Sequence, residues 1–214
     1  MPSYDLTRHA TNFAKRYSGV RMQQGRILTD DDFNEHARLD DERERRTHVD
    51  VIGPAGSNDS GLGIANPQST AAGLDFTIQA GTFYLGGLPI EMDTPETYLL
   101  QRDWLRRPPL TAPAADRLDL VYLEAWRQPV TAVEDEELFE VGLATGDTSA
   151  RTKLMRRIRV AEGAGRPNCR EAWAAFLQTL ASQGTLNDEN EWVSDTTLRV
   201  TYSPPGNPGD LCNP

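Results

Sequence analysis

The sequence has few cysteines and no long apolar run, and each shortage excludes a class of protein. The only cysteines, Cys169 and Cys212, give neither a disulfide framework nor the ligand spacing of a metal site, so both are predicted to be free thiols. No segment approaches the run of about 18 apolar residues that a membrane span needs. The first residues lack the apolar centre of a signal peptide, which predicts synthesis in the cytoplasm without Sec-type export.

An excess of positive charge is also missing. The net charge is −10 and the isoelectric point is near 4.8, so the chain as a whole repels a nucleic-acid backbone. Binding to DNA or RNA is therefore not expected. With 214 residues, of which 38% are hydrophobic, the chain can nevertheless bury a core in one domain or two small ones.

A charged helix is predicted after Thr29. Thr29 is a suitable N-cap, Asp32 lies three residues later at the capping-box spacing, and the acids at 30–32 suit the positive end of a helix dipole. From residue 33 to 48 the only sizeable apolar side chains are Phe33 and Leu39. Such a helix cannot bury a wide apolar stripe, so it is either solvated or packed on a polar partner.

Favourable charge pairs support the same helix. Asp41 with Arg45 and Glu42 with Arg46 stand four residues apart, acid first, and each such pair contributes roughly 0.2–0.5 kcal/mol to a helix. Pairs of this strength stabilise the helix without fixing it to a core.

The remaining pattern predicts an α+β fold, with a small antiparallel β-sheet or sandwich core, an N-terminal charged helix and a later amphipathic helix. A hairpin is predicted around Gly86-Gly87, and a central strand at 118–127 should end before Pro129. Further elements are expected as a short acidic helix at 134–140, a half-exposed strand with a basic outer face at 151–159, an amphipathic helix at 168–183 and a last strand at 198–202. The predicted organisation is an arm and docking helix at 1–53, a Gly/Pro/Ser-rich linker at 54–73, a β-rich domain at 74–203 and a tail or linker at 204–214.

The patterns of known chemistry are incomplete. Asp30, Asp32 and Asn34 match the first positions of a calcium loop, but Glu35 stands where that loop needs glycine and Asp41 where it needs glutamate. The glycines at 61–63 lack the third glycine of a dinucleotide-binding turn, and any acid pair among 32 acids can be a solvated pair. We therefore predict no catalytic residue, no metal and no cofactor.

Three segments carry a resemblance to a known family. The stretch at 20–35 has a glutamine–glycine–arginine turn before an acidic helix, the stretch at 76–91 has a glycine–aromatic–glycine β element, and 120–160 combines a strand, an acidic piece and a basic strand. Over roughly residues 17–160, the chain resembles an uncharacterised N-terminal domain of phage-tail-like proteins encoded alongside contractile injection systems. No catalytic residue is carried over from this family.

The resemblance implies a non-enzymatic structural subunit near the baseplate, spike or fibre of such a particle, present in many copies, which can be released from the cell with the particle. Its partners would be other subunits of the particle and further copies of the chain. The acidic piece at 134–140 and the basic strand at 151–159 could pair between copies or within one chain. The alternatives are a carbohydrate-binding or carbohydrate-processing module, with tryptophans lining a groove, and a delivered effector. The residues predicted to bind a partner are Gln23, Gln24, Arg26, Asn34, Glu35, Arg38, Arg43, Arg45 and Arg46.

Overall fold

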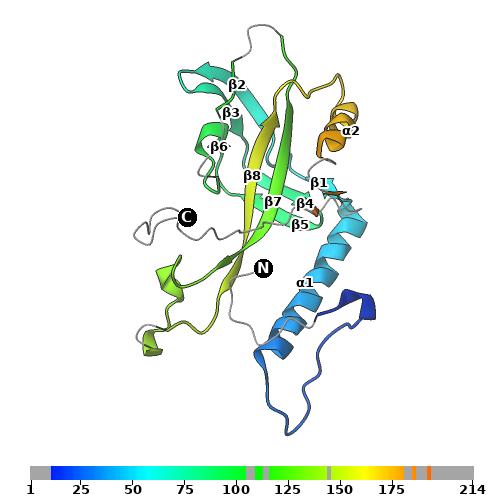
Figure 1. Cartoon of the computed structure of the whole chain (residues 1–214), viewed down its shortest axis with the longest axis vertical. Helices are drawn as coiled ribbons and strands as arrows, with labels where there is room; N and C mark the ends of the chain where they lie inside the picture. The colour runs from blue at the N-terminus through cyan, green and yellow to red at the C-terminus, as the bar shows by residue number, and fades with distance from the viewer. Residues whose placement is uncertain are drawn as a thin grey trace, which may run out of the picture.

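The computed structural model describes residues 11–104, 109–112, 116–143, 146–180, 185–186 and 192–193. The strand predicted at 198–202, the tail at 204–214 and Cys212 lie outside the described residues. Within them the fold is α+β, as predicted, with a charged N-terminal helix, a later helix and several small antiparallel sheets (Figure 1).

The helices are α1 (Asp30–Ile52) and α2 (Cys169–Leu180), with short 3-10 helices η1 (Phe13–Lys15), η2 (Tyr98–Leu100), η3 (Glu136–Leu138) and η4 (Val141–Leu143). The strands are β1 (Ala55–Gly56), β2 (Ile64–Thr70), β3 (Gly73–Ile78), β4 (Gly81–Leu85), β5 (Leu88–Met92), β6 (Glu96–Thr97), β7 (Leu120–Val130), β8 (Arg151–Ala161), β9 (Thr185–Leu186) and β10 (Trp192–Val193). They form four antiparallel groups, in the orders β1-β4-β5, β2-β3-β6, β7-β8 and β9-β10.

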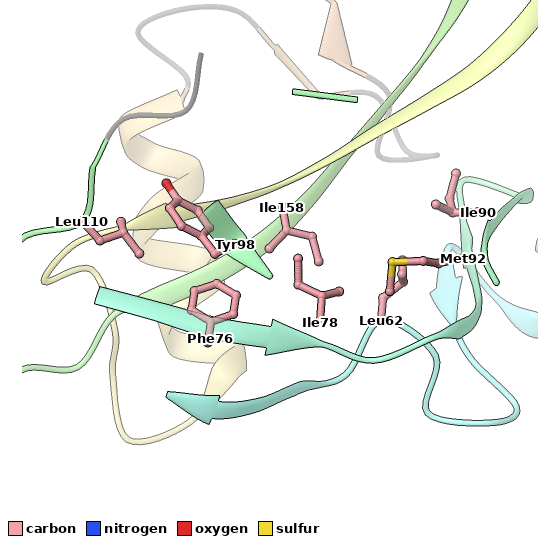
Figure 2. Close-up of a cluster of buried hydrophobic side chains, with 8 residues drawn as sticks. All are labelled: Leu62, Phe76, Ile78, Ile90, Met92, Tyr98, Leu110 and Ile158. Atoms are coloured by element: carbon pink, nitrogen blue, oxygen red, sulfur yellow. The ribbon is translucent and has the colours of Figure 1, made fainter. Parts of the chain in front are cut away.

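One apolar core joins the first three sheets. Figure 2 shows its buried side chains, which come from β3, β5, β8, η2 and the loops next to them. Phe76 and Tyr98 pack with ring centroids 5.2 Å apart, and Ile158 reaches the same cluster from β8. The core members are Leu62, Phe76, Ile78, Ile90, Met92, Tyr98, Leu110 and Ile158.

The segment predicted as a linker at 54–73 contains two strands. It contains β1, which pairs with β4, and β2, which pairs with β3 across a register shift between Ala65 and Gln68. Most residues of β2 are polar and exposed. The sequence of β2 therefore lacks the apolar alternation that predicts a strand. The prediction of irregular structure was therefore wrong for β1 and β2, which are strands because they pair with β4 and β3.

The long β7–β8 ribbon also differs from the prediction. All eleven residues of β7 pair with β8, Pro129 included, and β7 has no second paired neighbour among the described residues. A proline lacks the N–H of a ladder but is tolerated on an edge strand. The strand is therefore an edge strand that continues through Pro129 to Val130, rather than a central strand that ends before it.

The amphipathic helix begins where the sequence predicts, directly after the expected N-cap residue Asn168. The Oδ1 of Asn168 accepts a hydrogen bond of 2.8 Å from the backbone N–H of Glu171, which is the expected N-cap contact. Phe176 of α2 packs on Tyr122 of β7, with ring centroids 4.8 Å apart. Cys169, at the first position of this helix, is an exposed free thiol.

Candidate functional site

The charged helix begins where the sequence predicts. The hydroxyl of Thr29 accepts a hydrogen bond of 3.3 Å from the backbone N–H of Asp32 and donates one of 2.8 Å to its carboxylate. Over the whole length of α1, only Asp31 and Leu39 are buried. The helix is therefore held by local capping and by a few polar contacts in its middle and second half, rather than by an apolar stripe.

The second half of α1 is fixed to the turn between β4 and β5. Arg45 Nη1 donates to the carbonyl of Gly86 over 2.9 Å, and the Nδ1 of His48 lies 2.9 Å from the carbonyl of Gly87. A carbonyl only accepts, so the Nδ1 of His48 carries the proton in this contact. His48 also meets the ring of Tyr84 edge-on at 5.2 Å. This contact between α1 and the hairpin is intramolecular.

Charge pairs along α1 partly differ from the predicted ones. Glu42 pairs with Arg46 at 2.6 Å, as predicted, but it also pairs with Arg45 at 2.8 Å. The hydrogen bond from Arg45 is the main reason that the pKa of the Glu42 carboxyl is lowered from its usual value, and Arg46 lowers it further. Asp41, which was predicted to pair with Arg45, lies 3.9 Å from Arg127 of β7.

The predicted partner-binding residues fall into two groups. Arg38 and Arg45 make contacts within the chain, because Arg38 donates to Thr11 over 2.6 Å and only 12% of the Arg45 side chain is exposed. The others are exposed or half-buried along the loop before α1 and on α1 itself, although Arg43 and Arg46 also pair with acids of the helix. The second group consists of Gln23, Gln24, Arg26, Asn34, Glu35, Arg43 and Arg46.

We call residues 11–28 the arm. At its first residue, Thr11, the arm is hydrogen-bonded to Arg38 in the middle of α1. From there it runs past the lower end of the helix in Figure 1 and leads into the start of the helix at Thr29. Met22, Ile27 and Leu28 are exposed in it, with 89% of the Ile27 side chain open, and Phe33 extends the exposed apolar surface onto α1. The arm encloses an open hollow of about 550 Å³, lined by Val20, Arg21, Met22, Gln23, Arg26, Ile27, Leu28 and Asp32.

We call residues 131–143 the tip. They follow β7 and form the first part of its connection to β8. The tip has local structure of its own: Glu134 accepts hydrogen bonds from the backbone N–H and hydroxyl of Thr131, and Asp135 caps η3. Val133, Phe139, Val141 and Leu143 are exposed on it, with Val141 96% open. The sequence predicted a short acidic helix here, and its apolar side chains, placed between acids, were the signal of an exposed apolar surface that the prediction missed.

The central arginines of the basic strand β8 form ion pairs with acids outside the tip. Arg157 and Arg159 of β8 both pair with Glu124 of β7, which lies directly opposite Arg157 and diagonally opposite Arg159. Arg156 points the other way and pairs with Glu96 of β6. Within one chain, these three arginines therefore pair with Glu96 and Glu124 rather than with the acids of the tip.

Two tryptophans that could line a sugar groove lie against Arg157. Its guanidinium is 5.6 Å from the ring centre of Trp104 and 5.3 Å from that of Trp126. Trp104 also meets Tyr98 of the core edge-on. Both rings are thus part of the packing on the ribbon.

A second hollow lies beneath α1 and has a volume of about 250 Å³. It is lined by Asp41, Glu44, Arg45, His48, Gly87, Leu88, Pro89, Arg127, Thr152 and Leu154. In the part of the chain that the structure describes, no group of three or more His, Cys, Asp or Glu side chains is placed to hold a metal ion. None of the helices in the described ranges combines the length and apolar content that crossing a bilayer requires.

Comparison with models of known protein families gives a match over most of the chain. The family model described as "Family of unknown function (DUF6519)" matches residues 3–189. No curated protein matches the chain, and no solved structure matches it.

Proposed function

Since the chain belongs to DUF6519, a family of unknown function, we propose its function from its own residues: a non-enzymatic structural subunit of a phage-tail-like contractile particle. In this proposal the arm and the exposed side of α1 dock to a baseplate, spike or fibre component. The resemblance of the sequence over roughly residues 17–160 supports the kind of particle. The exposed surface of the arm supports the docking role.

The observation that carries the proposal is the exposure of large apolar side chains beside the start of α1. Met22, Ile27, Leu28 and Phe33 lie within twelve residues of one another and are all exposed. Scattered single apolar residues are ordinary on a surface, but a group of this kind rimmed by polar side chains marks an interaction site. Burying one such side chain contributes about 1.5–3 kcal/mol, whereas an exposed ion pair contributes about 0.2–1 kcal/mol. Apolar burial therefore supplies most of the binding energy, and exposed charges of α1 such as Arg43 and Arg46 contribute less.

The test is the presence of the protein in purified particles, and the effect of substitutions in the arm. Particles from cells that express the gene should contain the protein, and its absence from them would refute the proposal. Ile27→Asp places a charge in the arm and should strongly reduce incorporation. Leu100→Asp is the matched control, because Leu100 is as exposed as a docking residue but belongs to η2, outside the arm and α1. Incorporation should stay at the wild-type level in this control.

A second variant tests the contribution of the helix. Arg43→Glu with Arg46→Glu reverses two exposed charges and leaves Arg45, which holds the hairpin, in place. We expect lower incorporation, with a thermal transition of the purified protein that is lowered only slightly, because each of the two exposed pairs contributes roughly 0.2–0.5 kcal/mol. Full incorporation of this variant would remove Arg43 and Arg46 from the docking surface and leave the arm with the start of α1.

A further inference from the structure

The arm and the tip carry opposite charge. Residues 11–28 contain four basic side chains and no acid, whereas residues 131–143 contain five acids and no basic side chain. The basic side chains of the arm are Lys15, Arg16, Arg21 and Arg26. The acids of the tip are Glu134, Asp135, Glu136, Glu137 and Glu140.

Neither set of charges is neutralised within the described part of the chain. The ion pairs found there involve none of the four cations of the arm and none of the five acids of the tip. Glu134 and Asp135 accept hydrogen bonds inside the tip, but Glu136, Glu137 and Glu140 have exposed side chains. Both surfaces therefore combine uncompensated charge with exposed apolar side chains.

Each surface has the features that the other needs in a partner. Ile27 and Leu28 of the arm lie next to Arg26, and Val141 of the tip lies next to Glu140. Contact between arm and tip would bury apolar side chains on both sides and place carboxylates beside guanidinium groups, which form charge-assisted hydrogen bonds. Like charges would meet if an arm approached an arm or a tip approached a tip. The complementarity therefore selects arm against tip.

We propose that the arm of this protein binds the tip of a second copy of the same chain. The proposal rests on the proposed function in one respect, the use of the arm as a docking surface, and it names the partner of that surface. Figure 1 shows the arm and the tip at the same end of the molecule, on opposite sides of it. One copy can therefore offer its arm to one neighbour and its tip to another, or exchange both contacts with a single neighbour related by a two-fold axis.

Reversal of charge on each surface tests the pairing. The arm variant is Arg21→Glu with Arg26→Glu, and the tip variant is Glu136→Lys with Glu137→Lys, which leaves the hydrogen-bonding Glu134 and Asp135 unchanged. The full-length wild type should sediment as an oligomer, and each variant alone should sediment as a monomer. An equimolar mixture of the two variants should assemble again, because the reversed arm of one then matches the reversed tip of the other while their unchanged surfaces still match.

Recovery in the mixture distinguishes pairing from damage to the fold, because a misfolded variant cannot be rescued by another misfolded variant. The control is Arg166→Glu with Arg170→Glu, which reverses two exposed charges away from both surfaces and should leave the oligomer intact. A wild type that is monomeric at every soluble concentration, or variants that fail to assemble on mixing, would overturn the proposal. Incorporation into particles is measured separately, so a protein that enters particles but does not self-associate refutes this inference alone.

Discussion

At the scale of single residues, Arg156 shows how a charge is placed inside the fold. It lies between Leu154 and Ile158 on the inward face of β8, and its side chain is only 9% exposed. Two hydrogen bonds, of 2.9 and 3.2 Å, join its guanidinium to the carboxylate of Glu96. A buried ion pair is tolerated when its two members hydrogen-bond each other. Removal of one member destabilises the fold, because the other charge stays buried.

We therefore expect Arg156→Met to destabilise the protein by about 1–3 kcal/mol, because the buried Glu96 carboxylate loses two hydrogen bonds and keeps only its contacts with Arg102. The double variant Glu96→Leu with Arg156→Met should lose less stability than the single one, because neither side chain then carries a charge. The midpoint of urea unfolding measures both. Lys153→Met on the same strand is the control, since Lys153 is exposed and should change the midpoint little. A double variant less stable than Arg156→Met would contradict this account.

At the scale of elements, local patterns in the sequence predicted those whose signals are local. The Thr29 cap, the Gly86-Gly87 hairpin and the Asn168 cap each depend on residues a few positions apart, and each is confirmed. Elements fixed by distant partners were not predictable in the same way. The exposed strand β2 exists because β3 pairs with it, so its own composition indicated a linker.

The candidate site shows the same division between local and distant information. The sequence indicated that α1 has little apolar surface, and the structure agrees. It did not indicate that Arg45 would donate a hydrogen bond to the β4–β5 hairpin, because its partner Gly86 is 41 residues away in the sequence. The inward position of Arg156 was predictable, because side chains alternate between the two faces of a strand and Arg156 is an even number of residues from Leu154, Ile158 and Val160 on β8. Its partner Glu96, 60 residues away, was not predictable.

The contact between α1 and the hairpin depends on Gly87. Its φ is +81°, and a Cβ there would lie 2.2 Å from the carbonyl oxygen of Arg45. Gly87→Ala should therefore destabilise the protein by about 1–3 kcal/mol, from the strained backbone together with displacement of α1. The thermal transition measures the loss, and amide hydrogen exchange should rise in the second half of α1. Gly25→Ala is the matched control, because its φ of +74° carries similar strain but a Cβ there meets nothing within 4 Å. Equal losses in the two variants would mean that the helix contact adds nothing.

At the scale of the whole molecule, two electrostatic effects oppose each other when copies associate. Each copy carries a net charge of −10, so two copies repel at long range, while the arm and the tip attract at contact. The Debye length is about 10 Å at 0.1 M salt, so repulsion between the bodies of two copies is already largely screened there. Above that concentration, further salt acts mainly on the arm and tip.

We therefore expect self-association to weaken as salt rises from about 0.1 M to 0.5 M, with the dissociation constant increasing up to about tenfold. The reason is that four cations of the arm face acids of the tip in an exposed contact, where each pair is weak and easily screened. Sedimentation equilibrium over a salt series measures the slope. Arg21→Gln with Arg26→Gln removes two of the four charges without reversing them, so this variant should bind more weakly at 0.1 M and respond less to salt. A dissociation constant that stays constant or falls over this range would show that apolar burial alone joins the copies, and that the opposite charges of arm and tip do not select the partner.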